Sequence, residues 1–579
     1  MFRSTRDGIP EVYVSDVNSP RSPARRVTCA GERVAWAAFA RDGASILFLR
    51  DEGGNQRFRL FRTSLDGSAV ELLTPDDTTI YRHIPILPRT NPARIVYSAR
   101  LAGSPSTRVI VHAIGDDGQR VIYEDPFAGT CVDTTEDGSR ALFLRNASLV
   151  DSMVLEIDLE TGAARPVFPR TGEATIACVA YSADGTAMFV ACETHLDGPC
   201  LLALDASTGE IKATHRQEVP AGSFISRLVV SPDGHSVAIR VDAGSHSDLH
   251  ILDAKTLTSR IQVATLLGGI ELYPFSDDGR YFAISQSVPD HPVELFLVDA
   301  STGAVRPLRM EPRPGLETDT MAVSIHRIPA FDGLEIPVNL YVPKQSPSSA
   351  ASPLATIVLI HGGPAASAQV RWNPAARFFT SLGYVVIEPN IRGSIGFGRA
   401  YAMADDREKR WNAFRDVESI HAWAAHHSFC DPRRMILMGG SYGGYVTLMS
   451  LGLQPALWRA GISLFAMADL RKYVRLLGPG ARKALAEEFG DPEADAELLA
   501  ELSPIRRLEK IVAPLFVYAG ENDPQVGRRD SDSIVRVLKD RGVPVEYMVG
   551  ANEGHSMERR ETQVMFFMRA ARFLSEHLQ

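Results

Sequence analysis

Hydrophobic and polar positions alternate in short runs through the first half of the chain. Five of these runs follow an Asp-Gly turn, at Asp42, Asp137, Asp184, Asp233 and Asp278. The last four turns recur 45 to 49 residues apart, and one degenerate copy, residues 91–94 followed by IVYSA, fills the longer first gap. Each unit carries a second turn signal, such as Thr161-Gly162. Alternating runs between such turns are typical of β-hairpins, so each unit predicts two hairpins, or four strands.

Repeats of 40 to 50 residues with four short strands are typical of a β-propeller. Counting the units predicts about seven blades, the first one partial at its start. An array of β-sandwiches is the alternative that the same turns leave open. The repeats end in a segment rich in proline and charge, residues 309–317. We therefore predict a β-propeller domain over residues 1–312 and a second domain over 313–579.

In the second half, apolar runs alternate with helical patterns. After a predicted β-hairpin (325–342) and a Ser/Pro/Ala linker on the surface (345–353), we expect strands at 356–360, 385–388, 435–438, 461–465, 515–518 and 545–549. This alternation predicts a mostly parallel, doubly wound sheet with helices on both faces. Residues 562–578 predict a closing amphipathic helix. Its apolar stripe is expected to be Val564, Phe567, Met568, Ala571, Leu574 and Leu578.

Composition and charge indicate which classes of partner and which cell compartment to expect. A net charge of −9 over 579 residues does not suggest nucleic acid or an anionic membrane as a partner. No run reaches 18 apolar residues and the start has no apolar core, so we expect neither a membrane span nor a signal peptide. The six cysteines have no paired metal spacing. They predict reduced thiols in a cytoplasmic protein. We expect neither a metal nor a cofactor.

One stretch carries the pattern of a serine nucleophile. Gly439-x-Ser441-x-Gly443 lies between a predicted strand and a predicted helix, which is the context of a nucleophile elbow. Asp523 and His555 each follow a later predicted strand. The order serine, aspartate, histidine is the chain order of α/β-hydrolases. We expect Ser441 to be the nucleophile, His555 the base that takes its proton, and Asp523 the residue that orients the imidazole.

A second glycine-rich turn, His361-Gly362-Gly363-Pro364, follows the first predicted parallel strand. The backbone N–H groups of Gly363 and of Tyr442 would form an oxyanion hole, although a simple tight turn is the alternative for the first of them. His361 is expected to make structural hydrogen bonds. Glu488, with the glutamate before it, is expected on the exposed side of a helix.

Taken together, these motifs resemble the prolyl oligopeptidase family. The residues that carry the resemblance are HGGP (361–364), NIRGS (390–394), GGSYGGY (439–445), NDP (522–524) and GH (554–555), behind a propeller. The GGSYGGY form is closer to the acylaminoacyl-peptidase and dipeptidyl-peptidase branches. The resemblance implies a serine hydrolase that cleaves peptide or acyl-amino-acid amide bonds in small substrates, through an acyl-enzyme on Ser441. It also places the active site in a cavity between the domains.

Two departures limit what the resemblance implies about the substrate. Gln525 stands where related acylaminoacyl peptidases often have an arginine that holds a substrate carbonyl. Dipeptidyl peptidases bind the free amino terminus of the substrate with a pair of glutamates from the propeller, and residues 1–310 contain no adjacent pair of glutamates. An esterase or an acyl transferase with the same triad is therefore the alternative. A propeller binding protein with an inert hydrolase half is a third hypothesis, against which the intact set of motifs argues.

Besides Gln525, the candidate substrate-binding residues are Phe465 and Tyr473, for which core packing is the alternative. We expect short peptides or acylated small molecules as partners. Open blade and sheet edges could also support a homo-oligomer, and the sequence does not decide the oligomeric state.

Overall fold

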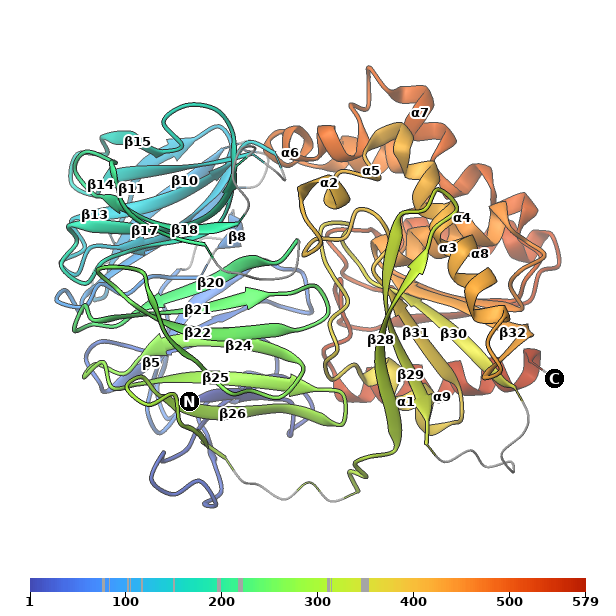
Figure 1. Cartoon of the computed structure of the whole chain (residues 1–579), viewed down its shortest axis with the longest axis horizontal. Helices are drawn as coiled ribbons and strands as arrows, with labels where there is room; N and C mark the ends of the chain where they lie inside the picture. The colour runs from blue at the N-terminus through green and yellow to red at the C-terminus, as the bar shows by residue number, and fades with distance from the viewer. Residues whose placement is uncertain are drawn as a thin grey trace.

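The fold was obtained as a computed structural model, which describes residues 1–74, 79–82, 84–101, 104, 106–115, 118–148, 151–194, 199–216, 222–309, 313, 315–344 and 353–578. The first half of the chain forms one body of β-sheets, and the second half forms a mixed body of helices and strands beside it (Figure 1). No helix in the described part of the chain is long and apolar enough to cross a membrane.

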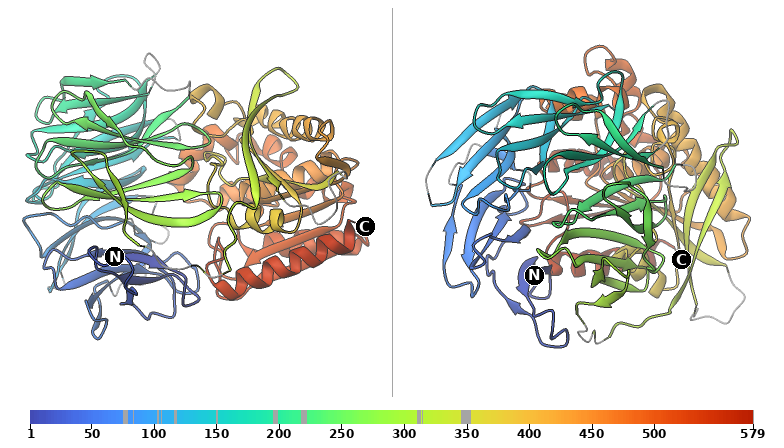
Figure 2. Two further views of the ribbon diagram at one scale, coloured as in Figure 1. Left: turned by 60° about the horizontal axis from the view of Figure 1, so that its bottom comes forward. Right: turned by 60° about the vertical axis from the view of Figure 1, so that its left-hand side comes forward.

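The first body is a β-propeller of seven antiparallel sheets, counted over the described residues, packed around a common centre (Figure 2). The first sheet has three strands and the other six have four, so the predicted seven blades with a partial first blade are confirmed and the sandwich alternative is wrong. The strands are β1 (Phe2–Ser4), β2 (Glu11–Val14), β3 (Arg25–Arg26); β4 (Val34–Phe39), β5 (Ser45–Arg50), β6 (Arg59–Ser64), β7 (Val70–Leu72); β8 (Thr79–Arg82), β9 (Arg94–Leu101), β10 (Thr107–Ala113), β11 (Gln119–Asp125); β12 (Ala128–Thr134), β13 (Arg140–Asn146), β14 (Ser152–Asp158), β15 (Ala164–Phe168); β16 (Ala174–Tyr181), β17 (Ala187–Thr194), β18 (Cys200–Asp205), β19 (Ile211–His215); β20 (Phe224–Val230), β21 (Ser236–Asp242), β22 (Ser247–Asp253), β23 (Ser259–Gln262); β24 (Gly269–Phe275), β25 (Tyr281–Val288), β26 (His291–Asp299) and β27 (Val305–Pro307).

The Asp-Gly turns close the hairpins in the way that their chemistry predicts. In the fifth blade, the Asp184 carboxylate accepts hydrogen bonds from the Ser182 hydroxyl at 2.6 Å and from the Thr186 amide at 3.0 Å. Gly185 adopts φ +67°, a left-handed conformation that glycine reaches without steric cost. The hydrogen bond from Ser182 is the main reason that the pKa of Asp184 lies below its usual value. The Asp-Gly turns at 42, 137, 233 and 278 have the same carboxylate-to-amide hydrogen bond, so the repeated turn is a repeated hydrogen-bonded structure in five blades.

The second body is built on an eight-stranded sheet. Its order is β28-β29-β31-β30-β32-β33-β34-β35, with antiparallel pairing up to β31 and parallel pairing from β31 to β35. The strands are β28 (Met321–Pro329), β29 (Glu335–Pro343), β30 (Leu354–Ile360), β31 (Val385–Pro389), β32 (Cys430–Gly440), β33 (Ala460–Leu464), β34 (Leu515–Gly520) and β35 (Val545–Gly550). The mostly parallel sheet is therefore confirmed. The boundary predicted at residue 312 and the predicted linker up to residue 352 lie outside the described residues.

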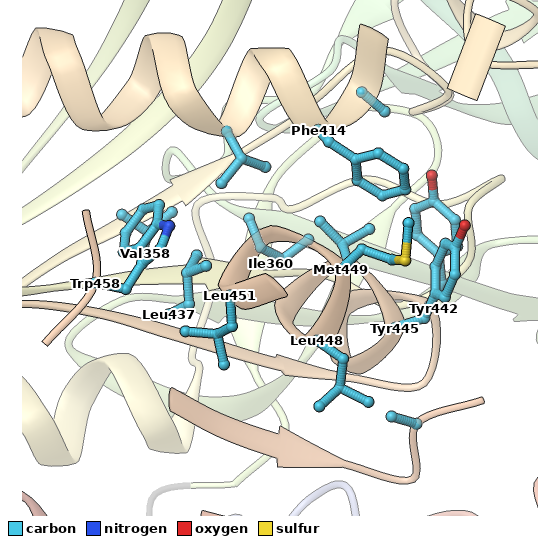
Figure 3. Close-up of a cluster of buried hydrophobic side chains, with 14 of the residues drawn as sticks. Val358, Ile360, Phe414, Leu437, Tyr442, Tyr445, Leu448, Met449, Leu451 and Trp458 are labelled. Atoms are coloured by element: carbon cyan, nitrogen blue, oxygen red, sulfur yellow. The ribbon is translucent and has the colours of Figure 1, made fainter. Parts of the chain in front are cut away.

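Helices cover both faces of this sheet. They are α1 (Pro374–Ser381), α2 (Arg399–Ala402), α3 (Arg410–Ala425), α4 (Tyr442–Leu453), α5 (Leu470–Leu476), α6 (Pro479–Phe489), α7 (Ala496–Glu501), α8 (Arg528–Asp540) and α9 (Arg560–His577). One buried cluster packs α3, α4 and α8 against one face, and a second packs α1 and α9 against the other. The first cluster surrounds α4, whose aliphatic side chains contact those of Val358 and Leu437 on the sheet (Figure 3).

The apolar stripe predicted for the last helix is only partly right: Leu574 is buried and Phe567 and Leu578 pack against the same cluster, but other members of the stripe face solvent. The face of α9 that packs on the sheet consists of Phe566, Ala570, Phe573 and Leu574. Val564 and Met568, both assigned to the stripe, are 52% and 67% exposed. The helix carries apolar residues around much of its circumference, so periodicity alone does not select the buried face. The aromatic contacts of Phe566 and Phe573 with Phe516 of β34 decide it.

Candidate active site

Ser441 occupies a strained turn between β32 and α4. The strand ends at Gly440, the helix begins at Tyr442, and Ser441 between them has φ 57° and ψ −119°. A positive φ is uncommon for a residue with a side chain and concentrates at functional sites. The Ser441 amide donates to Leu464 O at 2.9 Å, which ties the turn to the neighbouring strand. The strand-turn-helix context expected of a nucleophile elbow is therefore present.

The structure brings Ser441, His555 and Asp523 together from three separate loops. His555 Nε2 lies 2.9 Å from Ser441 Oγ, and His555 Nδ1 lies 2.7 Å from Asp523 Oδ2. The other carboxylate oxygen of Asp523 accepts the amides of Gln525 at 2.8 Å and Val526 at 2.9 Å. These bonds fix the carboxylate, and the carboxylate selects the tautomer with a proton on Nδ1. Nε2 is then an acceptor for the Ser441 hydroxyl.

Backbone groups that could bind an oxyanion lie beside the serine. Tyr442 is the first residue of α4, so its N–H has no partner within the helix and points out at the positive end of the helix dipole. The turn at 361–364 is on the other side: a methyl group placed on Gly362 would lie 3.6 Å from Ser441 Cβ. Gly363 has φ +138°. Both sequence-predicted donors thus belong to segments that adjoin Ser441.

His361 makes the structural hydrogen bonds that the sequence predicts. Its Nδ1 lies 2.7 Å from Gly362 O and its Nε2 lies 2.8 Å from Ser394 Oγ. Burial lowers the pKa of His361, so the ring is neutral at physiological pH. The Ser394 hydroxyl also donates to Ile391 O at 2.6 Å. The ring therefore connects the 361–364 turn to the loop that contains Ser394.

The three candidate substrate-binding residues have different surroundings. The Phe465 ring lies 5.2 Å from the His555 ring and 5.0 Å from that of Tyr518. Tyr473 packs edge-on against Phe489 at 6.4 Å, and burial, followed by the charge of Asp523, raises its pKa. Gln525 extends in another direction.

The side chain of Gln525 bridges the two domains, because its Nε2 donates to Gln56 Oε1 on the propeller at 3.2 Å. Among the three candidate substrate-binding residues, Phe465 lies directly against the triad, because its ring contacts that of His555. Core packing accounts for part of the environment of Tyr473.

The propeller contacts the loops that carry the triad. Asn522, which precedes Asp523, donates its side-chain amide to Gly53 O at 3.0 Å. Gly54 packs against Gly554, the residue before His555, so closely that a methyl group on Gly54 would lie 2.3 Å from Gly554 N. Gly53 and Gly54 belong to the turn between β5 and β6 of the second blade. The candidate site is therefore bordered by both domains.

A buried charge cluster lies beside Tyr442 and was not predicted from the sequence. The guanidinium of Arg410, at the start of α3, lies between the carboxylates of Asp405 and Glu488, and all three side chains are buried. The expectation that Glu488 faces solvent is wrong, because α6 turns it towards Arg410. Burial raises the pKa of Glu488 to about 8. No local pattern indicates this cluster, since its members come from three elements.

Asp405, Asp406 and Glu488 bring their carboxylate oxygens within 4.8 Å of one another. Such a group could hold a cation, and here the guanidinium of Arg410 provides the positive charge among them. Cation–π contacts with Tyr442 at 5.3 Å and Phe489 at 4.3 Å complete its surroundings.

Comparisons with known proteins agree with this architecture. Residues 369–579 match the model of the prolyl oligopeptidase family. The chain is 24% identical to dipeptidyl aminopeptidase BIII of Pseudoxanthomonas mexicana, over 99% of this chain and 84% of that protein. It is 27% identical to the human acylamino-acid-releasing enzyme, over 43% of this chain and 34% of that enzyme.

Among solved structures, a puromycin hydrolase superposes with a TM-score of 0.83 at 19% sequence identity, covering 96% of this chain and 89% of that one. The shared fold thus extends over both domains, beyond the region that the family model matches. With the serine elbow, these findings lead to one conclusion: residues 369–579 form a domain that matches the prolyl oligopeptidase family, and the chain as a whole is similar to peptidases of that type.

Proposed function

We propose that Ser441, His555 and Asp523 are the catalytic triad of a hydrolase that cleaves amide bonds in short peptides or acylated amino acids. The observation that carries the proposal is the pair of hydrogen bonds that runs from Ser441 Oγ through His555 to Asp523, at 2.9 and 2.7 Å. This arrangement suits a nucleophilic serine, since His555 can take the proton of the Ser441 hydroxyl at Nε2 while Asp523 accepts a hydrogen bond from Nδ1–H and stabilises the imidazolium.

In the proposed reaction, His555 Nε2 takes the hydroxyl proton as Ser441 Oγ attacks the substrate carbonyl carbon. The carbonyl oxygen becomes an oxyanion, which the N–H groups of Tyr442 and Gly363 bind. The tetrahedral intermediate collapses when the imidazolium gives its proton to the leaving amine, and the acyl group stays on Ser441. A water molecule, deprotonated by His555, then attacks the ester and releases the acid.

Phe465 is the proposed wall of the pocket for the side chain before the scissile bond, because its ring borders His555. Tyr473 and Gln525 are proposed as more distant parts of the binding region. The two relatives named above are an aminopeptidase and an enzyme that releases acylated amino acids. Their names indicate the two kinds of substrate proposed for this chain, which are peptides with a free amino terminus and peptides with a blocked one.

Steady-state hydrolysis of a matched panel tests the proposal. The panel contains acetyl-amino-acid anilides, dipeptide anilides with a free amino terminus, blocked prolyl peptides and aryl esters. The proposal expects a preference in kcat/KM for amides, and about a million-fold loss of turnover in Ser441→Ala without loss of fold. Turnover confined to esters would favour the esterase or acyl transferase alternative. Retention of most activity in Ser441→Ala would refute the triad.

We also propose a cytoplasmic setting, which the cysteine pattern predicts. Cys131 in the fourth blade and Cys430 at the start of β32 are buried thiols. Burial raises the pKa of Cys131 to about 12 and that of Cys430 above its usual value, so both stay protonated and unreactive. Fractionation of the source cells, followed by immunodetection, tests the assignment; recovery outside the cytoplasmic fraction would refute it.

A further inference from the structure

If Ser441 acts as proposed above, the oxyanion hole beside it must be held in place by the surrounding structure. Its two donors, the amides of Tyr442 and Gly363, come from segments far apart in the sequence. Oxyanion donors must lie close to the position that the oxyanion will occupy, so a shift of either segment reduces the rate. The buried residues behind the two segments therefore matter for catalysis, although they touch no substrate.

The first contact fixes Tyr442. Its hydroxyl donates to Asp405 Oδ2 at 2.7 Å, and both side chains are almost completely buried. Tyr442 is the residue after Ser441 and opens α4, so its side chain and its amide belong to the same turn of backbone. The rings of Tyr442 and Tyr445 lie side by side at one end of the core cluster (Figure 3). Asp405 thus anchors the residue that supplies one donor.

The second contact leads to the other donor. Asp405 Oδ1 lies directly beneath Gly393, where a methyl group would come within 2.3 Å of it. Gly393, with φ +97°, precedes Ser394, and the Ser394 hydroxyl lies 2.8 Å from His361 Nε2. His361 in turn bonds Gly362 O in the turn that contains Gly363. One carboxylate therefore supports both segments, one by a hydrogen bond and the other by close packing.

Arg410 holds this carboxylate in position. Its guanidinium lies 3.4 Å from Asp405 Oδ2 and bonds both the side chain and, at 3.0 Å, the backbone carbonyl of Glu488. A buried carboxylate is costly unless it is paired, and the arginine supplies the pairing. Asp405 is therefore held rigidly between an ion pair and the two segments.

We propose that Asp405 is a positioning residue that sets the spacing of the two oxyanion donors, acting through Tyr442 on one side and through Gly393, Ser394 and His361 on the other.

The test compares two neighbouring tyrosines of α4. Tyr442→Phe removes only the hydroxyl that bonds Asp405. Tyr445→Phe is the matched control, because Tyr445 is equally buried and its hydroxyl has no hydrogen-bond partner among the described residues. The readouts are kcat and KM on an amide substrate, and the Ki of a peptidyl trifluoromethyl ketone, whose hemiketal oxygen occupies the oxyanion hole.

We expect Tyr442→Phe to lower kcat about 10-fold with KM within about twofold of wild type, and to raise the Ki of the ketone by a similar factor. Tyr445→Phe should match the wild type in all three. Asp405→Asn, which keeps the shape and one acceptor oxygen, should retain more kcat than Asp405→Ala. If either Asp405 variant fails to fold, the tyrosine pair still decides.

An unchanged kcat and Ki in Tyr442→Phe, or an equal effect of both tyrosine variants, would overturn the inference. Failure of the proposed function would look different. In that case the wild type would not bind the ketone, and Ser441→Ala would keep its activity whatever the tyrosine variants do.

Discussion

At the scale of single residues, the space around Ser441 explains which glycines of the elbow are required. A methyl group on Gly443 would lie 2.2 Å from Ile360 O, and one on Gly439 would lie 2.4 Å from the carbonyl carbon of Gly443. Both contacts are with backbone, which cannot move aside. The nearest atom to a methyl group on Gly440 would be Leu464 Cβ at 3.9 Å, an ordinary contact. A methyl group on Gly444 would lie 2.7 Å from Leu464 O, again a backbone atom. Of the four glycines of the motif, Gly440 is therefore the one that tolerates a side chain.

We predict that Gly443→Ala destabilises the protein by about 1–3 kcal/mol and displaces the serine, because overpacking in a rigid site forces backbone shifts. Its rate of labelling by a fluorophosphonate should fall at least about tenfold, since a displaced Ser441 loses its alignment with His555. Gly440→Ala is the control and should keep both the denaturation midpoint and the labelling rate. Equal behaviour of the two variants would contradict this account of the elbow.

At the scale of elements, β31 is a fully buried strand that contains a titratable residue. Glu388 lies on this strand, with Tyr341 and Arg371 nearby, and accepts a hydrogen bond from Asn373, the residue that caps α1. Burial raises the pKa of Glu388 from its usual 4.5 to about 7. The folded protein thus keeps a proton on Glu388 between about pH 4.5 and 7 that the unfolded chain has lost.

Because the folded state binds more protons in this range, the free energy of unfolding falls as the pH rises from about 4.5 to 7. Above the folded pKa the loss is complete. Glu388→Gln removes this dependence. We predict that it changes the free energy of unfolding by less than about 1 kcal/mol at pH 5 and stabilises the protein by about 3 kcal/mol at pH 8, because the carboxyl titrates at about 7 in the folded protein and at 4.5 in the unfolded chain. Chemical denaturation at the two pH values measures the difference. Glu335→Gln, at an exposed position on β29, is the control, and a similar pH trend in both variants would refute the assignment.

At the scale of the whole molecule, the propeller and the triad loops share a surface. Gly54 of the second blade has φ +78° and packs on Gly554, next to His555. Gly43, in another turn of the same blade, has φ +67° but no atom within 4 Å of the position of a methyl group. Alanine at either position would have a similar backbone strain, because both residues have a positive φ. They differ in whether the added methyl group meets the hydrolase domain.

We predict that Gly54→Ala lowers kcat/KM at least about tenfold, because the methyl group displaces the backbone that carries His555 from its 2.9 Å contact with Ser441. Gly43→Ala should lose some stability to backbone strain and keep its kcat/KM. Steady-state kinetics on one amide substrate compares the pair. If both substitutions reduce kcat/KM equally, the effect belongs to the propeller fold and the contact with Gly554 plays no part in it.

Much of this organisation follows from local patterns in the sequence. The blades are each closed by their own turns, so the Asp-Gly period reports them directly. The elbow at Ser441 and the order of Asp523 and His555 depend on residues next to strand ends, which are also local features. The sequence thus determined the two kinds of fold and the identity of the three residues that meet at the candidate site.

The tertiary structure decided what depends on contacts between distant segments. The buried face of α9 is chosen by aromatic rings on β34, and the helical period could not select it. Glu488 is buried because α6 packs it against Arg410, more than seventy residues earlier in the chain. The bridge from Gln525 to the propeller and the support that Asp405 gives to two distant segments arise in the same way. Local sequence specifies each segment, whereas burial and pairing are set by which segments the fold brings together.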